Sequence, residues 1–275
     1  MIKFENVALP SAEQWKAAIM GARNPMNSWE KSDSHYCNEY YGCEKTRECD
    51  SLPNCYEIGP NDLDLMRRLA AGGPVHAKYR RMITVIVTIT APLYWWKEFD
   101  TYRVGVEKNS CSTMHKIHTR KFTLEDFSTE HLFDRYGDPS MNLNYGGKHP
   151  IDMMYDLIRT LNHFRQWYLE TKDKKYWWQM IQLLPSSYNQ KRTVMMNYEV
   201  LANIYKSRRN HKLDEWAEHG LEPRDWPKNG EEYRERMREP LCTSSLERKY
   251  FGFCDWIKTL PYSELITQEE VLASE

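Results

Sequence analysis

A cysteine between two hydroxyl side chains is the position in this chain that most favours covalent chemistry. Cys111 lies between Ser110 and Ser112, and two cationic residues, Arg103 and Lys108, precede it closely. Nearby cations favour the thiolate form of a cysteine, and the thiolate is the nucleophile. Cys111 is therefore a candidate catalytic nucleophile. The alternative is that the position needs a small residue and cysteine serves as one.

Four further cysteines, Cys37, Cys43, Cys49 and Cys55, recur at a constant spacing of six residues. Structural zinc sites usually take their thiolates from close pairs two to four residues apart, and this spacing departs from that pattern. We interpret the four cysteines as incidental to a polar, loop-rich insertion around residues 34–58. A zinc-stabilised interaction protein is the alternative that they leave open. The chain has seven cysteines in all, and without a secretory signal these predict free thiols.

Two other groups of residues are open to a functional and a structural interpretation. His211 and Glu215 are four residues apart in a predicted helix, but no third metal ligand accompanies them, so we predict a helix-surface pair and no metal site. A run of aromatic residues could stack on a flavin or a base, although such runs more often form a core or a subunit interface. Its members are Tyr94, Trp95, Trp96, Phe99 and Tyr102.

These residues need a scaffold that contains both helices and strands. Residues 11–22 predict a helix capped by Ser11, and residues 62–71 predict a second helix that stops at Gly72-Gly73-Pro74. Residues 82–90 alternate β-branched apolar residues with threonine, which predicts a half-buried strand that ends at Pro92. A short aromatic helix is predicted over residues 93–103.

The remainder of the chain has mainly a helical pattern. Residues 152–173 and 193–219 place apolar residues near the helical period, and a last helical region extends to about residue 260. We therefore predict one α+β domain over residues 1–275. It has an antiparallel or mixed sheet flanked by helices, with a long helical C-terminal half.

The bulk composition is that of a globular protein without a global attraction to nucleic acid or membranes. Of 275 residues, 41% are hydrophobic and 28% are charged, and the formal net charge is -1. Any anion site must therefore be local. The N-terminus lacks the pattern of a signal peptide, and the longest apolar-leaning stretch, residues 82–96, is too short to span a bilayer. We predict a cytoplasmic protein whose partner is a small molecule rather than a nucleic acid or a membrane.

Two segments resemble the motifs of the flavin-dependent thymidylate synthases. In residues 76–111, His76 falls on the histidine of the family, Ala91-Pro92 on its strand end, Arg103 on the last arginine of its R-H-R-x7-S signature, and Cys111 on the serine. In residues 181–208, Leu184-Pro185 resembles the L-P turn of the family, and a helical N-x5-N-x4-R pattern follows it. The three residues of that pattern are Asn197, Asn203 and Arg208. Both segments align without gaps and together identify the chain as a divergent member of this family.

The resemblance implies a set of site residues and ligands. It implies cofactor binding by His76, Arg103, Asn197 and Asn203, and a role for Arg208 in catalysis and substrate binding. Cys111 is a catalytic candidate on its own chemistry, because members of the family do not need a nucleophile at that serine. The flanking Ser110 and Ser112 are candidate substrate-binding residues. It implies FAD as the cofactor, with NADPH and methylenetetrahydrofolate as co-substrates. It also implies a homotetramer whose sites are shared between subunits.

The departures from the family pattern concern mainly phosphate-binding arginines. Thr101 and Tyr102 replace the first two residues of R-H-R, and Thr113 and Ile181 replace two further arginines. Cationic residues that lie close in sequence are candidate replacements. They are Lys97, Lys108, Lys116, Arg120, Lys191, Arg192 and Arg209.

The leading hypothesis is an FAD-dependent enzyme that transfers a one-carbon group to C5 of a deoxypyrimidine monophosphate, either dUMP or a related nucleotide. Cys111 is then a candidate nucleophile for C6 of the base. The alternative is a protein of the same fold that binds or sequesters a nucleotide without synthase activity, because a fold does not fix a function.

Overall fold

The computed structural model describes residues 2–36, 56–133, 148–219 and 251–268. Cys37, Cys43, Cys49 and Cys55, and with them most of the predicted insertion, lie outside the described residues. Within the described residues, no helix combines the length and the apolar character needed to cross a bilayer.

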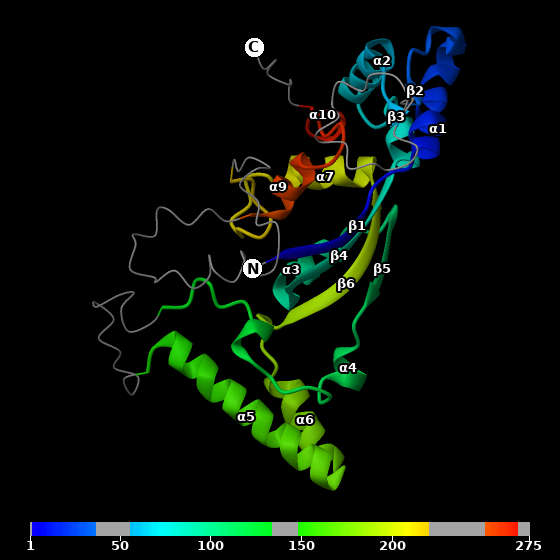
Figure 1. The fold of residues 1–275 in the computed structure, drawn as a ribbon. Coiled ribbons are helices and arrows are strands. Elements are labelled where there is room, and N and C mark those ends of the chain that lie inside the picture. Colours follow the sequence, from blue (N-terminus) through cyan, green and yellow to red (C-terminus); the bar gives the residue numbers. More distant parts are fainter. Residues whose placement is uncertain (1, 37–55, 134–147, 220–250, 269–275) are drawn as a thin grey trace.

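The centre of the fold is a four-stranded antiparallel sheet with the strand order β1-β4-β6-β5 (Figure 1). Its strands are β1 (Lys3–Ala8), β4 (Thr84–Pro92), β5 (Val106–Ser110) and β6 (Asn189–Asn197). The two central strands, β4 and β6, pair from Thr84 opposite Asn197 to Pro92 opposite Asn189. The predicted α+β fold class is therefore confirmed.

One face of the sheet forms the main core. Val85, Val87 and Ile89 of β4 are fully buried, as their alternation with threonine predicts. The helices α3 (Leu93–Phe99), α7 (Tyr198–Arg208) and α9 (Phe253–Lys258) contribute buried side chains to the same core. Ile86, on the opposite face of β4, is 41% exposed. The helices thus make up the core on one face of β4, whereas the other face is partly exposed, as at Ile86, and buries Thr88.

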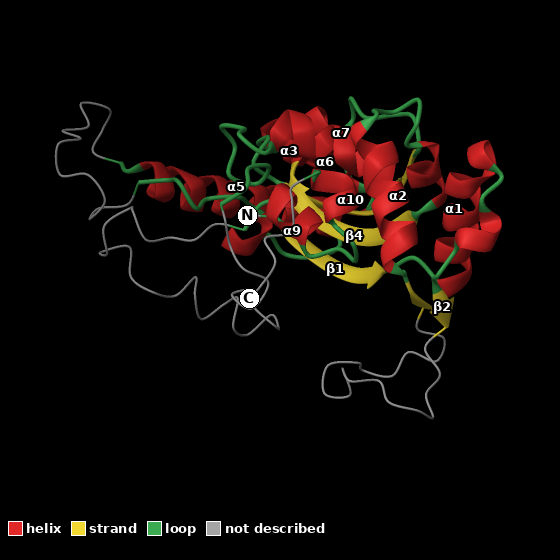
Figure 2. Cartoon of the chain, turned by 90° about the horizontal axis from the view of Figure 1, so that it is seen from above, coloured by secondary structure: helices red, strands yellow, loops and turns green. Residues whose placement is uncertain are grey.

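Two N-terminal helices lie beyond one end of the sheet, as the view from above shows (Figure 2). Helix α1 (Ala12–Arg23) begins at the predicted cap, where the Ser11 side chain accepts a hydrogen bond from the amide of Gln14. Helix α2 (Pro60–Ala71) ends at Gly72, also as predicted. Between them, the short strands β2 (His35–Tyr36) and β3 (Tyr56–Glu57) pair with each other.

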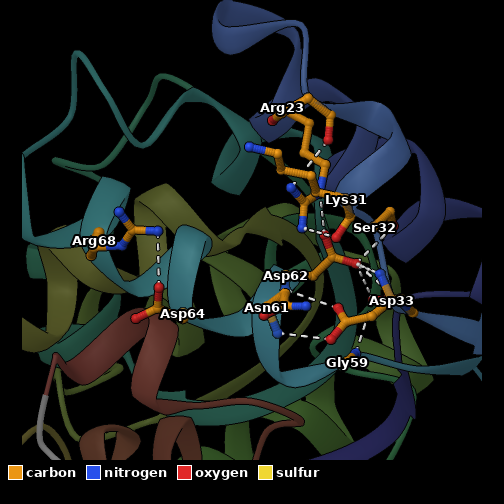
Figure 3. Close-up of polar contacts among 11 residues, drawn as sticks. Arg23, Lys31, Ser32, Asp33, Gly59, Asn61, Asp62, Asp64 and Arg68 are labelled. Atoms are coloured by element: carbon orange, nitrogen blue, oxygen red, sulfur yellow. Dashed lines mark hydrogen bonds and ion pairs between the residues drawn. The ribbon is translucent and has the colours of Figure 1, made fainter.

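A buried carboxylate holds these N-terminal segments together (Figure 3). Asp62 of α2 is inaccessible to solvent and pairs with Arg23 at the end of α1. It also accepts hydrogen bonds from the hydroxyls of Ser32 and Ser34 and from two backbone amides of residues 33 and 34. The segment that leads into β2 is therefore anchored to both helices through one side chain.

A helical hairpin extends beyond the opposite end of the sheet (Figures 1 and 2). It consists of α5 (Pro150–Thr171) and α6 (Lys174–Leu183), and its inner side forms a second, smaller core with Phe122 and Phe127. The remaining short helices are α4 (Thr113–Lys116) and α10 (Glu264–Thr267). The helical prediction for residues 152–173 is confirmed.

The prediction of one helix over residues 193–219 is wrong in two places. Residues 193–197 belong to β6, whose side chains alternate between the core, as at Val194 and Met196, and the exposed Thr193. The helix itself, α7, begins only at Tyr198 and ends at Arg208. Ladder pairing with β4 outweighs the helical spacing of Met195 and its apolar neighbours, because both sides of β6 have a strand to pair with.

Candidate functional site

A pocket of about 410 Å³ opens where β5 ends and β6 begins. Its volume lies within the range of small-molecule sites. Cys111 and Ser112 line it, so two of the predicted site residues share one cavity. The other lining residues are Thr113, Lys116, Ile117, Thr119, Arg120, Lys121, Phe122, Asp126, Tyr188, Asn189, Gln190 and Lys191.

The end of the β5–β6 ladder fixes the position of Cys111. The amide of Cys111 donates a hydrogen bond to the carbonyl of Lys191 at 2.9 Å. The next residue, Ser112, caps α4 by accepting a hydrogen bond from the amide of His115 at 3.1 Å. Strand β5 therefore ends and α4 begins beside the pocket, and the exposed thiol of Cys111 lies between these two elements.

A chain of hydrogen bonds supports the pocket wall from behind. The buried side chain of Gln190 donates to the carbonyl of Cys111 at 3.0 Å and accepts from Nε of Arg192 at 2.9 Å. Arg192 in turn donates to Asp100 at 2.9 Å, and its guanidinium lies 4.3 Å from the ring centre of Trp96. Arg192 is therefore a structural residue behind the wall and does not line the pocket.

The pocket carries more positive than negative charge. Four cationic residues line it, namely Lys116, Arg120, Lys121 and Lys191, against the single carboxylate of Asp126. Burial alone would lower the pKa of Arg120, but the hydrogen bond and the charge of Asp126 outweigh it and raise the pKa. Arg120 thus stays charged at any physiological pH.

An aromatic residue in the same pocket stays uncharged. Burial raises the pKa of the Tyr188 phenol, with the charge of Arg120 as the largest opposing effect. Together with Phe122, Tyr188 gives the pocket an apolar side on which a flat ring can pack. The pocket therefore combines cations, a free thiol, hydroxyl groups and aromatic rings.

Arg208, predicted to be catalytic, is engaged by its neighbours on the helical layer. Its guanidinium donates to the Tyr102 hydroxyl at 3.1 Å, pairs with Glu98 at 2.8 Å, and lies 2.9 Å from Nε2 of His211. It also lies 5.2 Å from the ring centre of Trp216. Although partial burial would lower the pKa of Arg208, Tyr102 and Glu98 raise it. A ligand of Arg208 would have to compete with these contacts.

Asn197 stands at the start of α7 rather than inside a long helix. Its side chain caps the helix by accepting a hydrogen bond from the amide of Val200 at 3.0 Å. Gly105 packs against the same side chain with a φ of +75°, where a Cβ would lie 2.7 Å from Nδ2 of Asn197. The cap accounts for asparagine at this position, so its low helix propensity is not in itself a sign of a binding role.

The remaining predicted cofactor residues are exposed and come from separate elements. His76 lies in the turn after α2, where its ring packs over Gly72, and Arg103 lies in the turn between α3 and β5. Asn203 is exposed on α7, and Ser110 closes β5 opposite Arg192.

The structure therefore divides the predicted residues into two groups. Cys111 and Ser112 lie at one end of the β5–β6 ladder, and Asn197 lies at the other end. Asn197 lies six positions after Lys191, which is bonded to Cys111, or about 20 Å further along β6 at the usual strand rise. Within one copy of the chain, a single nucleoside monophosphate does not span this separation.

The two ambiguous groups of residues are largely structural. Trp95, Trp96 and Phe99 are fully buried, and Trp95 stacks on Trp216 with 4.4 Å between ring centres. His211 contacts Arg208, and Glu215 accepts a hydrogen bond from Tyr94. In the described parts of the chain, no three metal-ligating side chains gather at one place.

Sequence reasoning missed several pocket residues. The basic segment from Lys116 to Lys121 contains two of the proposed replacement cations, Lys116 and Arg120, and this density of charge was the available signal. Tyr188 and Gln190 gave no such signal, since only the pairing of β5 with β6 brings them to Cys111.

Comparisons with known proteins give similarity at the level of structure. No protein-family model matches the chain, and no curated protein matches its sequence. Two solved structures of the flavin-dependent thymidylate synthase of Helicobacter pylori, both with FAD and dUMP, are similar to it. Each is 14% identical and covers 77% of this chain and 85% of its own, with TM-scores of 0.47 and 0.46.

The UMP/dUMP methylase PolB of Streptomyces cacaoi, bound with 5-Br UMP, is also similar. It is 14% identical and covers 78% of both chains, with a TM-score of 0.43. The Helicobacter pylori enzyme is a flavin-dependent thymidylate synthase, the family that the two sequence segments resemble. Its sequence identity to this chain is low.

Proposed function

We propose that the chain binds a pyrimidine nucleotide in the Cys111 pocket and transfers a one-carbon group to C5 of its base in an FAD-dependent reaction. The observation that carries the proposal is the pocket itself. It brings together Cys111, which occupies the position of the family's serine, and its neighbour Ser112 with cations that suit a phosphate and rings that suit a base. The substrate in this proposal is dUMP or a related nucleotide, with NADPH and methylenetetrahydrofolate as co-substrates.

The residues assigned to FAD come from separate elements of the fold. Arg103, His76 and Asn203 are exposed on separate elements, and the amide of Asn197 is used as a helix cap. FAD would supply the redox chemistry of the reaction. We assign no step to it, because Asn197, one of its proposed ligands, lies at the other end of the β5–β6 ladder from Cys111.

We further propose that copies of the chain associate, as a tetramer by the family resemblance. The outer side of the α5–α6 hairpin exposes large apolar residues. Met153 is 62% exposed, Trp178 42% and Trp167 38%. Aromatic residues and methionine are enriched in subunit interfaces. Light scattering coupled to size-exclusion chromatography tests this, and a monomer at micromolar concentration would contradict it.

The absorption spectrum of the purified protein, followed by titration with FAD and then dUMP, tests the main proposal. We expect a flavin band and a change in it when dUMP is added, because in the proposed reaction the base of the nucleotide would lie beside the flavin. Protein that takes up neither FAD nor dUMP would refute the proposal.

A second function has one observation in its favour. The proposed catalytic Arg208 is already engaged by Glu98, Tyr102 and His211, which leaves it less available for catalysis and is compatible with a nucleotide-binding protein that has no synthase activity. If dUMP or another nucleotide raises the unfolding temperature while FAD has no effect, the protein binds or sequesters nucleotides without synthase activity.

A further inference from the structure

We infer that Lys116, Arg120, Lys121 and Lys191 form the phosphate-binding part of the Cys111 pocket. They take the place of the arginines that the family has where this chain has Thr101, Thr113 and Ile181. The inference rests on the proposed nucleotide function and names the residues that would bind the phosphate.

The four cations approach the pocket from two sides. Lys116, Arg120 and Lys121 come from one short segment that begins in α4, and Lys191 comes from β6 opposite Cys111. All four side chains are exposed, with Arg120 at 65% and Lys191 at 48%, so their charged groups are available to a ligand. Cations that converge on a cavity raise the local concentration of an anion.

The only carboxylate in the pocket lining leaves most of this charge available. Asp126 is buried and pairs with Arg120, and it also accepts hydrogen bonds from the amide and the hydroxyl of Thr123. The pairing uses one end of the Arg120 guanidinium and holds the group in place. Because a guanidinium has five donors in a planar fork, its remaining donors suit a phosphate. Lys191 pairs with Glu5 of β1, on the side of β6 away from β5, so its ammonium has to turn from Glu5 to reach a ligand beside Cys111. Both groups are about half exposed, and such surface pairs are weak.

The other candidate replacements are engaged elsewhere. Lys108 and Arg192 both pair with Asp100 on the far side of the pocket wall. Neither they nor Lys97 and Arg209 line the pocket. Of the cations near the lost arginines, Lys116, Arg120 and Lys191 are therefore the ones placed beside Cys111, and Lys121 joins them.

The substrate class that follows is a nucleoside phosphate with its phosphate on these cations and its base on the side of Tyr188 and Phe122. The phosphate is a dianion near neutral pH. Each cation would donate its own charge-assisted hydrogen bond to it, so each contributes separately to the affinity. Removing one such contact is expected to weaken binding about 10-fold or more.

Calorimetric titration of the full chain with dUMP, deoxyuridine and inorganic phosphate tests the inference. The variants are Lys121→Gln, Lys116→Gln and Arg120→Gln, and the matched control is Lys97→Gln, an exposed lysine of α3 outside the pocket. The two lysine variants remove exposed side chains and so keep the test valid if Arg120→Gln, which leaves the buried Asp126 unpaired, fails to fold. We expect each pocket variant to weaken dUMP about 10-fold, to leave deoxyuridine unchanged, and to differ from the control.

The other outcomes distinguish failure of the phosphate site from failure of the nucleotide proposal. If dUMP binds and the pocket variants do not weaken it, or weaken deoxyuridine equally, the phosphate site is refuted while the nucleotide proposal stands. If no nucleotide binds but inorganic phosphate does, and the pocket variants abolish this, the phosphate site stands and the nucleotide proposal fails. If neither dUMP nor phosphate binds the wild-type chain, the phosphate site is refuted with it.

Discussion

Substitution of the buried carboxylate of Asp62 by alanine should destabilise the protein strongly. Asp62 is fully buried and balances the charge of Arg23, which is itself only 4% exposed (Figure 3). Asp62→Ala leaves that guanidinium buried with only the carbonyls of Ser28 and Lys31 as partners. Breaking a buried ion pair on one side costs about 3–5 kcal/mol. Two serine hydroxyls and two backbone amides also lose their acceptor. We therefore expect the loss in free energy of unfolding to lie toward the upper end of this range.

The same helix offers a matched control. Asp64, two residues further along α2, pairs with Arg68 at 2.9 Å, but both side chains are about two-thirds exposed (Figure 3). Exposed pairs four residues apart in a helix contribute about 0.3–0.5 kcal/mol. Urea unfolding of wild type, Asp62→Ala and Asp64→Ala, monitored by circular dichroism, measures both free energies. Equal losses in the two variants would refute the reasoning, since burial is the only large difference between the pairs.

The contribution of Asp62 has a defined dependence on pH. Burial alone would raise the pKa of Asp62, but the hydrogen bonds from Ser34 and Ser32 and the pairing with Arg23 outweigh it, so the net pKa is lowered. A carboxyl whose pKa is lower in the folded state stabilises the fold above its unfolded pKa, about 3.9, and loses this effect as the pH falls through the folded value. The difference between wild type and Asp62→Ala should therefore shrink below about pH 4. A difference that grows on acidification would contradict this sign.

Three further predictions concern the two ends of the β5–β6 ladder and the thiols. Gly105→Ala should lower the free energy of unfolding by about 1–3 kcal/mol, measured by thermal unfolding, because φ is +75° and the new Cβ would meet Asn197. The control Gly73→Ala has a φ of +86° but open space around the new Cβ, and it should lower the free energy of unfolding by less. Asn197→Ala should cost about 1 kcal/mol through loss of the α7 cap, and Asn197→Asp should restore most of it; an equal loss in both variants would contradict the capping role. Iodoacetamide should modify Cys111 and spare Cys254, since Cys111 is exposed, whereas Cys254 is buried and burial raises the pKa of its thiol. Peptide mass spectrometry measures this, and dUMP should slow the reaction of Cys111 if it fills the pocket.

The strands differ in how far the sequence alone predicts them. Strand β4 was predictable because its alternation of apolar residues with threonine is local and nearly complete. Strand β6 was not, because its inward positions include the polar Gln190 and Arg192, which obscure the period of two. Its conformation is decided by pairing with residues about a hundred positions away, as the contact between Thr88 and Thr193 shows. The edge strand β5, with the sequence VEKNS, has a single buried apolar residue and so no pattern to recognise.

The candidate site was predictable to a similar extent. Cys111 and Ser112 come from a local motif, and the structure places them in one pocket. The supporting contacts were not predictable, because Gln190 reaches Cys111 only through the register of β5 with β6. Conversely, Arg208 and Asn197 match the motif of the family, yet here one is held by Glu98 and Tyr102 and the other caps a helix. A motif gives residue types and spacing, but not which neighbours use the side chain.

The separation of the two groups of predicted residues bears on how a complete site could form. Hydrogen bonds require atoms about 3 Å apart. Asn197 and Cys111 lie at opposite ends of one strand pair, which is too rigid to bring them together. A nucleotide at Cys111 therefore does not reach Asn197 of the same copy, and we expect a complete site to take the second group from another copy of the chain. In that case nucleotide binding at Cys111 should persist when the protein is diluted to monomers, whereas FAD uptake should fall with the degree of association. If FAD uptake does not change on dilution, the cofactor binds within a single copy and the shared site is refuted.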